Sequence, residues 1–338
     1  MLKRFSIAVM ASVLGFSQMA LADATNVQLA PKGEIKGKIL VVASSVNEMK
    51  FKDGRPHKTG YYLGELAVPA QEFIKAGYQV DIATPDGTTP ALDKNSINLS
   101  IFDNNPDKLA RAMAFALSHP SMQKPFKLNE IARSVRTLNQ YDAVYVPGGH
   151  APMVDLMQNK DLGKILRHFH ETGKTTALLC HGGVALTAAL DNPAAFRKAM
   201  VQGDSQKAQS LAKNWIYKGY KMNVYSTAEE HGVENWLGAK IEFYMEDALR
   251  HAGGNVIVGE PDKPFIMVSL VLLDQHTVAV GDGKEILHGR EIRRGENGAV
   301  EAAWIHRMMP RVDCAMNPIP GILQARTLEW VAISFSNA

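Results

Sequence analysis

One cysteine stands where a nucleophile could be presented to a substrate. Cys180 follows the apolar run 175–179 and precedes His181, Gly182 and Gly183. A tight turn between strand and helix lifts a side chain clear of the sheet, and the unpaired amides of a helix N-terminus favour the reactive thiolate. Hydrolase turns of this kind prefer glycine two positions earlier, where this chain has Leu178. The segment alone therefore fits either a nucleophile or a buried structural cysteine.

The segments around Cys180 alternate between strand and helix patterns. Short apolar runs rich in β-branched residues indicate strands buried on both faces. Such runs lie at 39–43, 78–83, 141–146 and 175–179, with weaker or shorter ones at 220–225, 255–258 and 265–268. Helical spacing indicates helices at 66–74, before Gly77, at 162–169, before Gly173, and at 185–190 and 241–251. The alternation predicts an α/β fold with a mostly parallel sheet of about six or seven strands and helices on both faces.

A long insertion, residues 88–140, separates the second and third predicted strands. It contains helical patterns at 107–118 and 128–135. Because insertions of this length are often functional, we expect it to cover a site.

The first 22 residues have the pattern of a secretory signal peptide. Lys3 and Arg4 precede the apolar stretch 5–16, which is too short to span a bilayer, and Ala20-Leu21-Ala22 supplies the small residues of a cleavage site. We expect cleavage after Ala22 and a periplasmic or secreted protein whose domain spans 23–268. An uncleaved amphipathic anchor is the alternative.

Composition limits the classes of partner. The formal net charge is +3, of which Lys3 and Arg4 supply two, so the mature chain is near neutral. This balance gives no reason to expect nucleic acid or a membrane as a partner. Cys180 and Cys314 are the only two cysteines, so no disulfide framework is predicted. A bridge between them is disfavoured by the position of Cys180 in the turn.

Four segments together resemble the ThiJ/PfpI superfamily, which shares its flavodoxin-like, doubly wound fold with class I glutamine amidotransferase domains. They are Thr59–Leu66, Gly77–Gly87, Val146–His150 and Leu179–Gly182. The resemblance covers roughly 38–268. The long insertion and the Cys-His pair resemble the branch that contains glyoxalase III enzymes and heat-shock chaperones.

The resemblance assigns roles position by position. Cys180 is then the nucleophile, Glu65 the acidic residue that faces it, His181 the histidine, and Glu230 the carboxylate that orients His181, with Glu229 as the alternative. Residue type alone allows other interpretations. Glu65 could be a solvated acid at a helix start, His181 a helix cap, and the two adjacent glutamates an exposed pair.

The chemistry of these groups agrees with the resemblance. A thiolate that attacks an aldehyde leaves an oxyanion, for which the backbone amides of Gly149 and His181 are candidate donors. Glu65 in an apolar pocket could shuttle protons, and His181 could act as general acid or base. The resemblance implies a glyoxalase III-like lyase that converts methylglyoxal or glyoxal to a hydroxy acid without a cofactor. For such domains a homodimer is the commonest assembly.

Two other classes of function stay open. A holdase chaperone or oxidative-stress sensor needs only an accessible thiol of low pKa and neither Glu65 nor His181. A cysteine amidase or peptidase would use the same turn. A metal site is not expected, because His168 and His170, two residues apart, point in different directions on a helix, and His231 has no partner at a favoured spacing.

The tail, residues 269–338, does not follow the family pattern. Segments 269–273 and 277–280 indicate a strand pair, and no helical or strand period persists beyond Gly281. We hypothesise that the tail is sequence foreign to the domain, introduced by a frameshift or an inserted element. Limited proteolysis that leaves a stable fragment ending near Val268 would support this hypothesis, and a resistant tail would contradict it.

Overall fold

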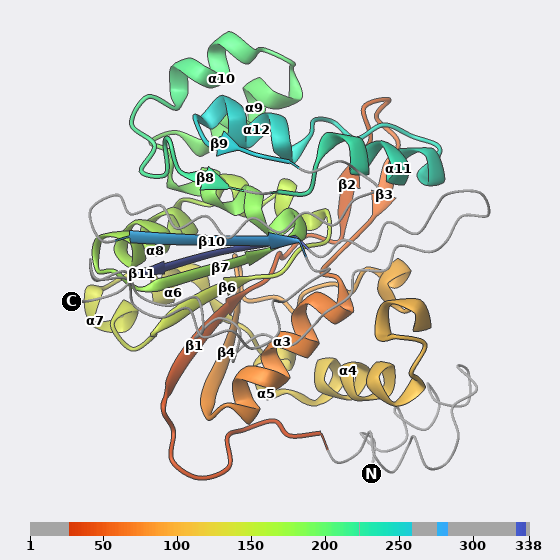
Figure 1. Ribbon diagram of the computed structural model, residues 1–338, viewed down its shortest axis with the longest axis vertical. Helices are drawn as coiled ribbons and strands as arrows, with labels where there is room; N and C mark the ends of the chain where they lie inside the picture. The colour runs from red at the N-terminus through yellow and green to blue at the C-terminus, as the bar shows by residue number, and fades with distance from the viewer. Residues whose placement is uncertain (1–26, 223, 259–275, 283–328, 336–338) are drawn as a thin grey trace, which may run out of the picture.

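The computed structural model describes residues 27–222, 224–258, 276–282 and 329–335 (Figure 1). The predicted signal peptide and the strands predicted at 265–268 and 269–273 lie outside the described residues, as does Cys314. No described helix is both long enough and apolar enough to cross a membrane.

A seven-stranded sheet forms the centre of the molecule, in the order β10-β11-β7-β6-β1-β4-β5. Its parallel strands are β1 (Gly37–Val42), β4 (Tyr78–Thr84), β5 (Phe126–Lys127), β6 (Ala143–Val146) and β7 (Thr175–Leu179). The antiparallel strands β10 (His276–Asp282) and β11 (Glu329–Phe335) complete one edge. The prediction of a mostly parallel α/β sheet is confirmed.

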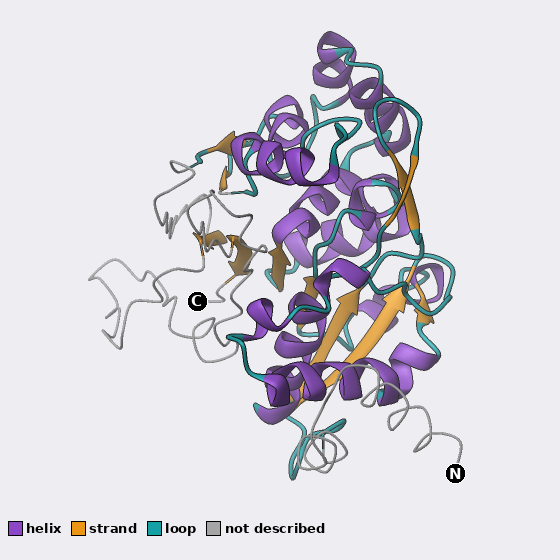
Figure 2. Ribbon diagram, turned by 90° about the vertical axis from the view of Figure 1, so that its right-hand side faces the viewer, coloured by secondary structure: helices purple, strands orange, loops and turns teal. Residues whose placement is uncertain are grey.

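Both faces of the sheet are buried, because alternate residues of a strand point to opposite sides. Leu40 and Val42 of β1 belong to one core, and Ile39 and Val41 belong to the other. The first core contains the buried sides of α8 (Lys160–Glu171), α9 (Pro193–Val201) and α12 (Met245–Ala252). The second contains α3 (Leu63–Lys75) and α4 (Pro106–Ser118), which pack together in Figure 1. Figure 2 shows helices on both sides of the strands.

Two predicted strands do not join the main sheet, so that part of the prediction is wrong. β8 (Lys221–Met222) and β9 (Asn255–Val256) pair with each other in a separate parallel ladder two residues long. β11 pairs with β7 instead. No strand was predicted at β11, because no strand periodicity was found beyond Gly281. The predicted strand 277–280 lies within β10, but its partner is β11. The origin of the tail stays a hypothesis.

The insertion is mostly helical and packs beside α3. Besides α4 and β5 it contains η1 (Lys94–Ser96), η2 (Leu99–Phe102), α5 (Pro120–Gln123), α6 (Leu128–Ile131) and α7 (Val135–Leu138). The helix predicted at 128–135 is interrupted, because the chain turns before Ser134 caps α7. The start of the insertion reaches the loop after β3, where the amide of Tyr61 donates to the carbonyl of Ala91 at 2.9 Å.

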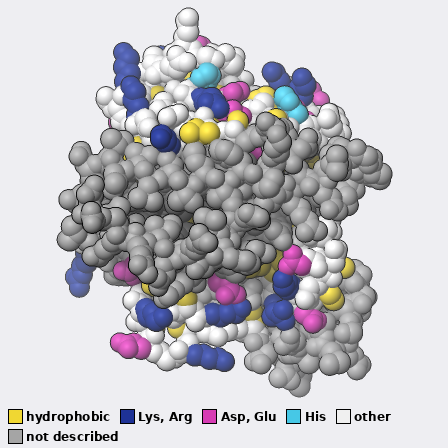
Figure 3. Space-filling model, viewed as in Figure 1, with side chains coloured by type: hydrophobic (Ala, Val, Ile, Leu, Met, Phe, Trp, Pro, Cys, Tyr) yellow, Lys and Arg dark blue, Asp and Glu magenta, His cyan; other side chains and the backbone are white. Residues whose placement is uncertain are grey.

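The remaining elements surround the carboxyl ends of the strands or pack on α9. They are the hairpin β2 (Glu48–Lys50) and β3 (Pro56–Lys58), the short helices η3 (Ala151–Met153), η4 (Leu156–Gln158) and η5 (Cys180–Ala189), α10 (Ser205–Leu211) and α11 (Thr227–Leu237). Where Figure 3 shows described residues, Lys and Arg side chains are interspersed with Asp and Glu.

Candidate active site

The backbone at Cys180 makes the sharp turn that the sequence indicated. Leu179 is extended, with φ −129° and ψ 139°, whereas Cys180 has φ 51°. A left-handed conformation at a residue other than glycine costs about 1–3 kcal/mol and is often found at functional sites. The turn leads into η5, a 3-10 helix, where the apolar spacing at 185–190 predicted a helix. Gly182 permits this path, because a Cβ there would lie 2.4 Å from the carbonyl oxygen of Val146.

His181 links the thiol to a carboxylate. Its Nδ1 lies 3.3 Å from the Sγ of Cys180, and its Nε2 lies 2.5 Å from the Oε2 of Glu230. The side chains of His181 and Glu230 are each 3% exposed. The His181 ring also packs against Tyr225, with centroids 4.9 Å apart. The three side chains form a continuous chain of contacts from thiol to imidazole to carboxylate.

The two adjacent glutamates of α11 have different partners. Glu229 closes a capping box at the start of α11, where its carboxylate accepts hydrogen bonds from the amide and hydroxyl of Ser226. Glu230 is buried and turns toward His181. The structure therefore brings Glu230, rather than Glu229, to the cysteine-histidine pair.

Glu65 approaches Cys180 from the opposite side of the sheet. It lies in the first turn of α3 and is 1% exposed, so it is not a solvated acid. Its Oε2 accepts a hydrogen bond from the amide of Gly148 at 2.8 Å. A Cβ built on Gly148 would lie 2.6 Å from that oxygen and 2.7 Å from the Cβ of Cys180. The carboxyl group and the thiol residue thus flank one glycine.

The Gly148-Gly149 segment runs beside the turn that carries the cysteine. The same Cβ on Gly148 would lie 2.9 Å from the amide nitrogen of His181. Gly149 has φ +86°, and a Cβ there would lie 2.1 Å from the carbonyl oxygen of Gly60. Gly148 therefore packs against the amide of His181, one of the two amides proposed as oxyanion donors, and Gly149, which carries the other, packs against Gly60.

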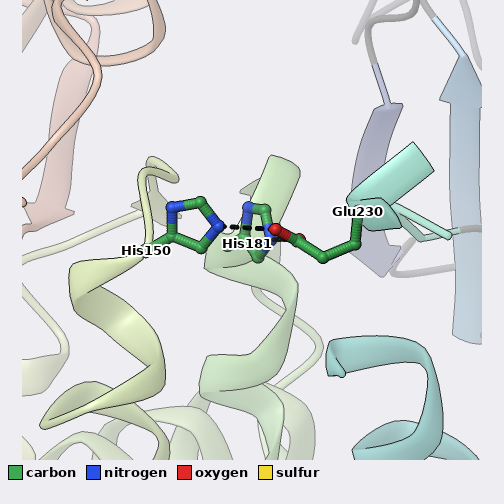
Figure 4. A group of neighbouring side chains, drawn as sticks. All are labelled: His150, His181 and Glu230. Atoms are coloured by element: carbon green, nitrogen blue, oxygen red, sulfur yellow. Dashed lines mark hydrogen bonds and ion pairs between the residues drawn. The ribbon is translucent and has the colours of Figure 1, made fainter. Parts of the chain in front are cut away.

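His150 belongs to the cluster, and no role was predicted for it from the sequence, although it ends the segment Val146–His150. Its Nε2 lies 2.8 Å from the Oε1 of Glu230, and its ring centroid lies 4.4 Å from that of His181 (Figure 4). Because β6 and β7 are parallel neighbours, residues that directly follow them meet at the same edge of the sheet. His150 follows the end of β6 after Pro147, Gly148 and Gly149, and its place at this edge of the sheet was the signal that could have marked it as a candidate, although it gives no indication of the contact with Glu230.

The charges of the cluster depend on one another. Burial raises the pKa of Glu230, but the two histidines outweigh burial and hold its pKa well below the ordinary range. Burial alone would lower the pKa of His150, yet the Glu230 carboxylate raises it overall. For His181 burial outweighs the attraction of Glu230, and the charge of His150 adds to burial, so its pKa is lowered. Near neutral pH these directions favour an ionised Glu230 between a protonated His150 and a neutral His181.

Among the described residues, His150, His181 and Glu230 are the one group of three or more potential metal-binding side chains, with ligand atoms within 4.8 Å of one another. Each histidine Nε2 is already at hydrogen-bond distance from a carboxylate oxygen. The other histidines considered from the sequence have separate partners: His168 bonds Asn139, His170 bonds the hydroxyl of Tyr220, and His231 bonds the hydroxyl of Tyr244.

The fold and these contacts define an α/β protein with a cysteine at a strained turn, in contact with a histidine and a buried acid. Residues 57–223 match the family described as ThiJ/PfpI family-like. All four of the sequence segments lie within the matched residues, and the resemblance found in them is confirmed.

Individual proteins are similar to this chain over about two thirds of its length. Protein/nucleic acid deglycase HchA of Escherichia coli O1:K1 / APEC is 29% identical over 225 residues, which are 66% of this chain and 69% of HchA. The structure of Rapid Encystment Protein 24 KDa of Francisella tularensis has a TM-score of 0.51 at 21% identity and matches 69% of this chain and 88% of its own. Glyoxalase III from Candida albicans has a TM-score of 0.47 at 21% identity, covering 70% and 90%. The likeness to the Francisella protein shows the fold.

Proposed function

We propose that this protein is an enzyme of the glyoxalase or deglycase type that acts on small reactive aldehydes through Cys180. The observation that carries the proposal is the convergence of a thiol and a buried carboxyl group, Glu65, across Gly148. A thiol alone would serve a sensor, and a holdase needs no buried acid beside it. The likeness to a protein named as a deglycase supports the same class of chemistry.

The proposed reaction converts methylglyoxal and water to lactate. The Cys180 proton passes to Nδ1 of His181, the sulfur bonds to the aldehyde carbon, and the carbonyl electrons move to oxygen, where backbone amides and a returned proton stabilise the hemithioacetal. Glu65 then takes the proton from the former aldehyde carbon and returns it to the neighbouring carbon, while the hydroxyl proton of the hemithioacetal passes to the neighbouring carbonyl oxygen, which leaves a thioester of the hydroxy acid. Water hydrolyses the thioester and releases lactate and the thiol.

The roles of the side chains follow from their positions. His181 contacts the sulfur through Nδ1, so it is placed to accept the thiol proton. Glu230 contacts the opposite nitrogen and stabilises the imidazolium that forms. The chemistry uses only groups of this chain, so no nicotinamide or other cofactor takes part in the proposal. A homodimer, the absence of nucleic-acid or membrane partners and export to the periplasm stay predictions.

The direct experiment is turnover of methylglyoxal by the purified protein without added metal or glutathione. Cys180→Ala should abolish activity, and Glu65→Gln should reduce it on the order of a hundredfold or more, as expected for loss of a general acid-base group. Glu72→Gln is the matched control, because Glu72 lies on the same helix at a partly exposed position paired with Lys75. Equal activity of the Glu65 and Glu72 variants would contradict the proposed role of Glu65.

Absence of turnover in the native protein would favour another function of the same fold. A reactive Cys180 without turnover would favour the sensor or holdase interpretation, which suppression of client aggregation tests. Release of ammonia or amine from an amide substrate would favour an amidase.

A further inference from the structure

The carboxylate of Glu230 is held by two histidines, and the proposed reaction uses one of them. Each carboxylate oxygen has its own partner, Oε1 with His150 at 2.8 Å and Oε2 with His181 at 2.5 Å. Figure 4 shows the side chain of Glu230 pointing toward both histidine rings, and Glu230 belongs to α11. A carboxylate bonded at both oxygens is fixed in rotation as well as in position.

His150 also contacts the base itself. Its ring lies 4.4 Å from the His181 ring, centroid to centroid, at an interplanar angle of 44°. On His181 the Tyr225 ring makes a second contact at 4.9 Å. The His150 side chain is 13% exposed, so its interaction with Glu230 is little screened by water. His150 therefore contacts both Glu230 and His181. The sulfur of Cys180 lies beside Nδ1 of His181.

The surroundings of His150 favour its charged form. Besides Glu230, the acidic groups that act on it are Asp93 and Glu65, and together they raise its pKa against the effect of burial. His57 of β3 is the basic group that also faces it, and burial, together with the charge of His150, lowers the pKa of His57. His181 faces Glu230, His150 and Glu229, and its pKa is lowered. Within the cluster the pKa of His150 is therefore raised while that of His181 is lowered.

We propose that His150 is a positioning residue of this site: it holds Glu230 against His181 and sets the pH range over which His181 accepts the proton of Cys180. The proposal rests on the proposed function for its effect on turnover, but the protonation of His181 can be measured without turnover.

The proton transfers remain balanced with His150 in this role. Its proton stays on the imidazolium throughout, shared in the hydrogen bond to Glu230. The mobile proton leaves the Cys180 sulfur, bonds to Nδ1 of His181, and later passes to the oxyanion. Loss of the His150 charge would leave the Glu230 carboxylate fully available to stabilise protonated His181, which would then retain the proton to higher pH.

Two substitutions separate the contributions that His150 can make. His150→Gln keeps an N–H donor for Glu230 and removes the charge, whereas His150→Phe keeps a ring against His181 and removes both the hydrogen bond and the charge. If His150 positions Glu230, the Gln variant should retain a kcat on the order of tenfold higher than the Phe variant, with KM nearly unchanged. If the ring serves only for packing, the order of the two variants reverses.

The protonation of His181 is measured by NMR of the full-length protein with 15N-labelled histidine, with its signals assigned by comparison with His181→Gln. We expect the pH midpoint of His181 to rise in His150→Gln, which keeps the hydrogen bond that holds Glu230 and removes the charge of His150. His168→Gln is the matched control, because His168 lies on α8 and bonds Asn139, and it should leave the midpoint unchanged. An unchanged midpoint in His150→Gln would overturn the proposal, even if His150→Phe failed to fold.

Alkylation of Cys180 by iodoacetamide distinguishes this proposal from the proposed function. If the native protein has no turnover, the Gln variant should still react faster than the Phe variant and the His181 midpoint should still rise. These results would support the proposed role of His150 even though the proposed substrate class would be wrong. Alkylation that is equal in both variants, with no change of midpoint, would reject the role of His150 whatever the substrate.

Discussion

Glu65 and Cys180 face each other across the α-carbon of Gly148. A Cβ at this position would lie 2.6 Å from the Oε2 of Glu65 and 2.7 Å from the Cβ of Cys180. Both distances are far below van der Waals contact, so any side chain at 148 separates the acid from the thiol. The glycine is therefore a condition of the proposed chemistry.

Gly148→Ala should lower kcat/KM for methylglyoxal on the order of a hundredfold, because displacement of a reacting group by about 1 Å costs that much. Steady-state kinetics measures the effect. Gly232→Ala is the control, because Gly232 lies inside α11, where an added Cβ would meet no atom within 4 Å, and it should raise stability by about 0.5–1 kcal/mol. Full activity in Gly148→Ala would show that the acid and the thiol need not be held on either side of this glycine.

The adjacent glutamates of α11 should differ in what their loss affects. Glu230→Gln removes the charge that supports His181, so we expect a large loss of kcat with little change of the secondary structure. Glu229→Ala removes the capping box at Ser226, so we expect a loss of about 1 kcal/mol in the free energy of unfolding with most activity retained. Urea unfolding and kinetics on both variants test the distinction, and a reversal of the two effects would exchange the roles of the residues.

Metal removal should leave activity unchanged. The potential ligand atoms of His150, His181 and Glu230 hydrogen-bond to one another, and the proposed reaction needs His181 as the acceptor of the thiol proton. Activity is measured after dialysis against EDTA, with added zinc as the comparison. If activity is lost on dialysis and restored by zinc, the cluster is a metal centre and the proton pathway is wrong.

The parallel strands β1, β4, β6 and β7 were predictable because each contains an apolar run of the right length that is buried on both faces, whereas β5, two exposed residues, was not predicted. The turn at Cys180 was predictable for the same reason, since it directly follows β7. β8 and β9 were misplaced because a short apolar segment carries no information about which sheet it joins. His150 was missed because its role depends on a partner 80 residues away, Glu230, and a histidine after a glycine pair gives no local indication of that contact.

Outside the active site, we expect His119 to make the stability of the fold depend on pH. It is 4% exposed, its Nδ1 lies 3.0 Å from the Oγ of Ser121, and that Oγ accepts a hydrogen bond from the amide of Ile82 on β4. Burial lowers the pKa of His119 from 6.5 to about 4, although the charge of Asp81 opposes the shift. The neutral form is therefore the one that packs in the core.

The pKa of His119 is lower in the folded protein than in the unfolded chain. The fold is therefore most stable above the pKa that His119 has in the unfolded chain, and it loses stability as the pH falls below that value. Between pH 6.5 and about 4 the unfolded chain binds a proton that the folded chain does not, so the free energy of unfolding should fall by about 3 kcal/mol from this group alone. Denaturant unfolding at several pH values should show a flatter profile for His119→Gln than for the native protein. His251→Gln, at a half-exposed position on α12, should keep the native profile. The same pH dependence in native protein and His119→Gln would mean that other groups cause the acid sensitivity.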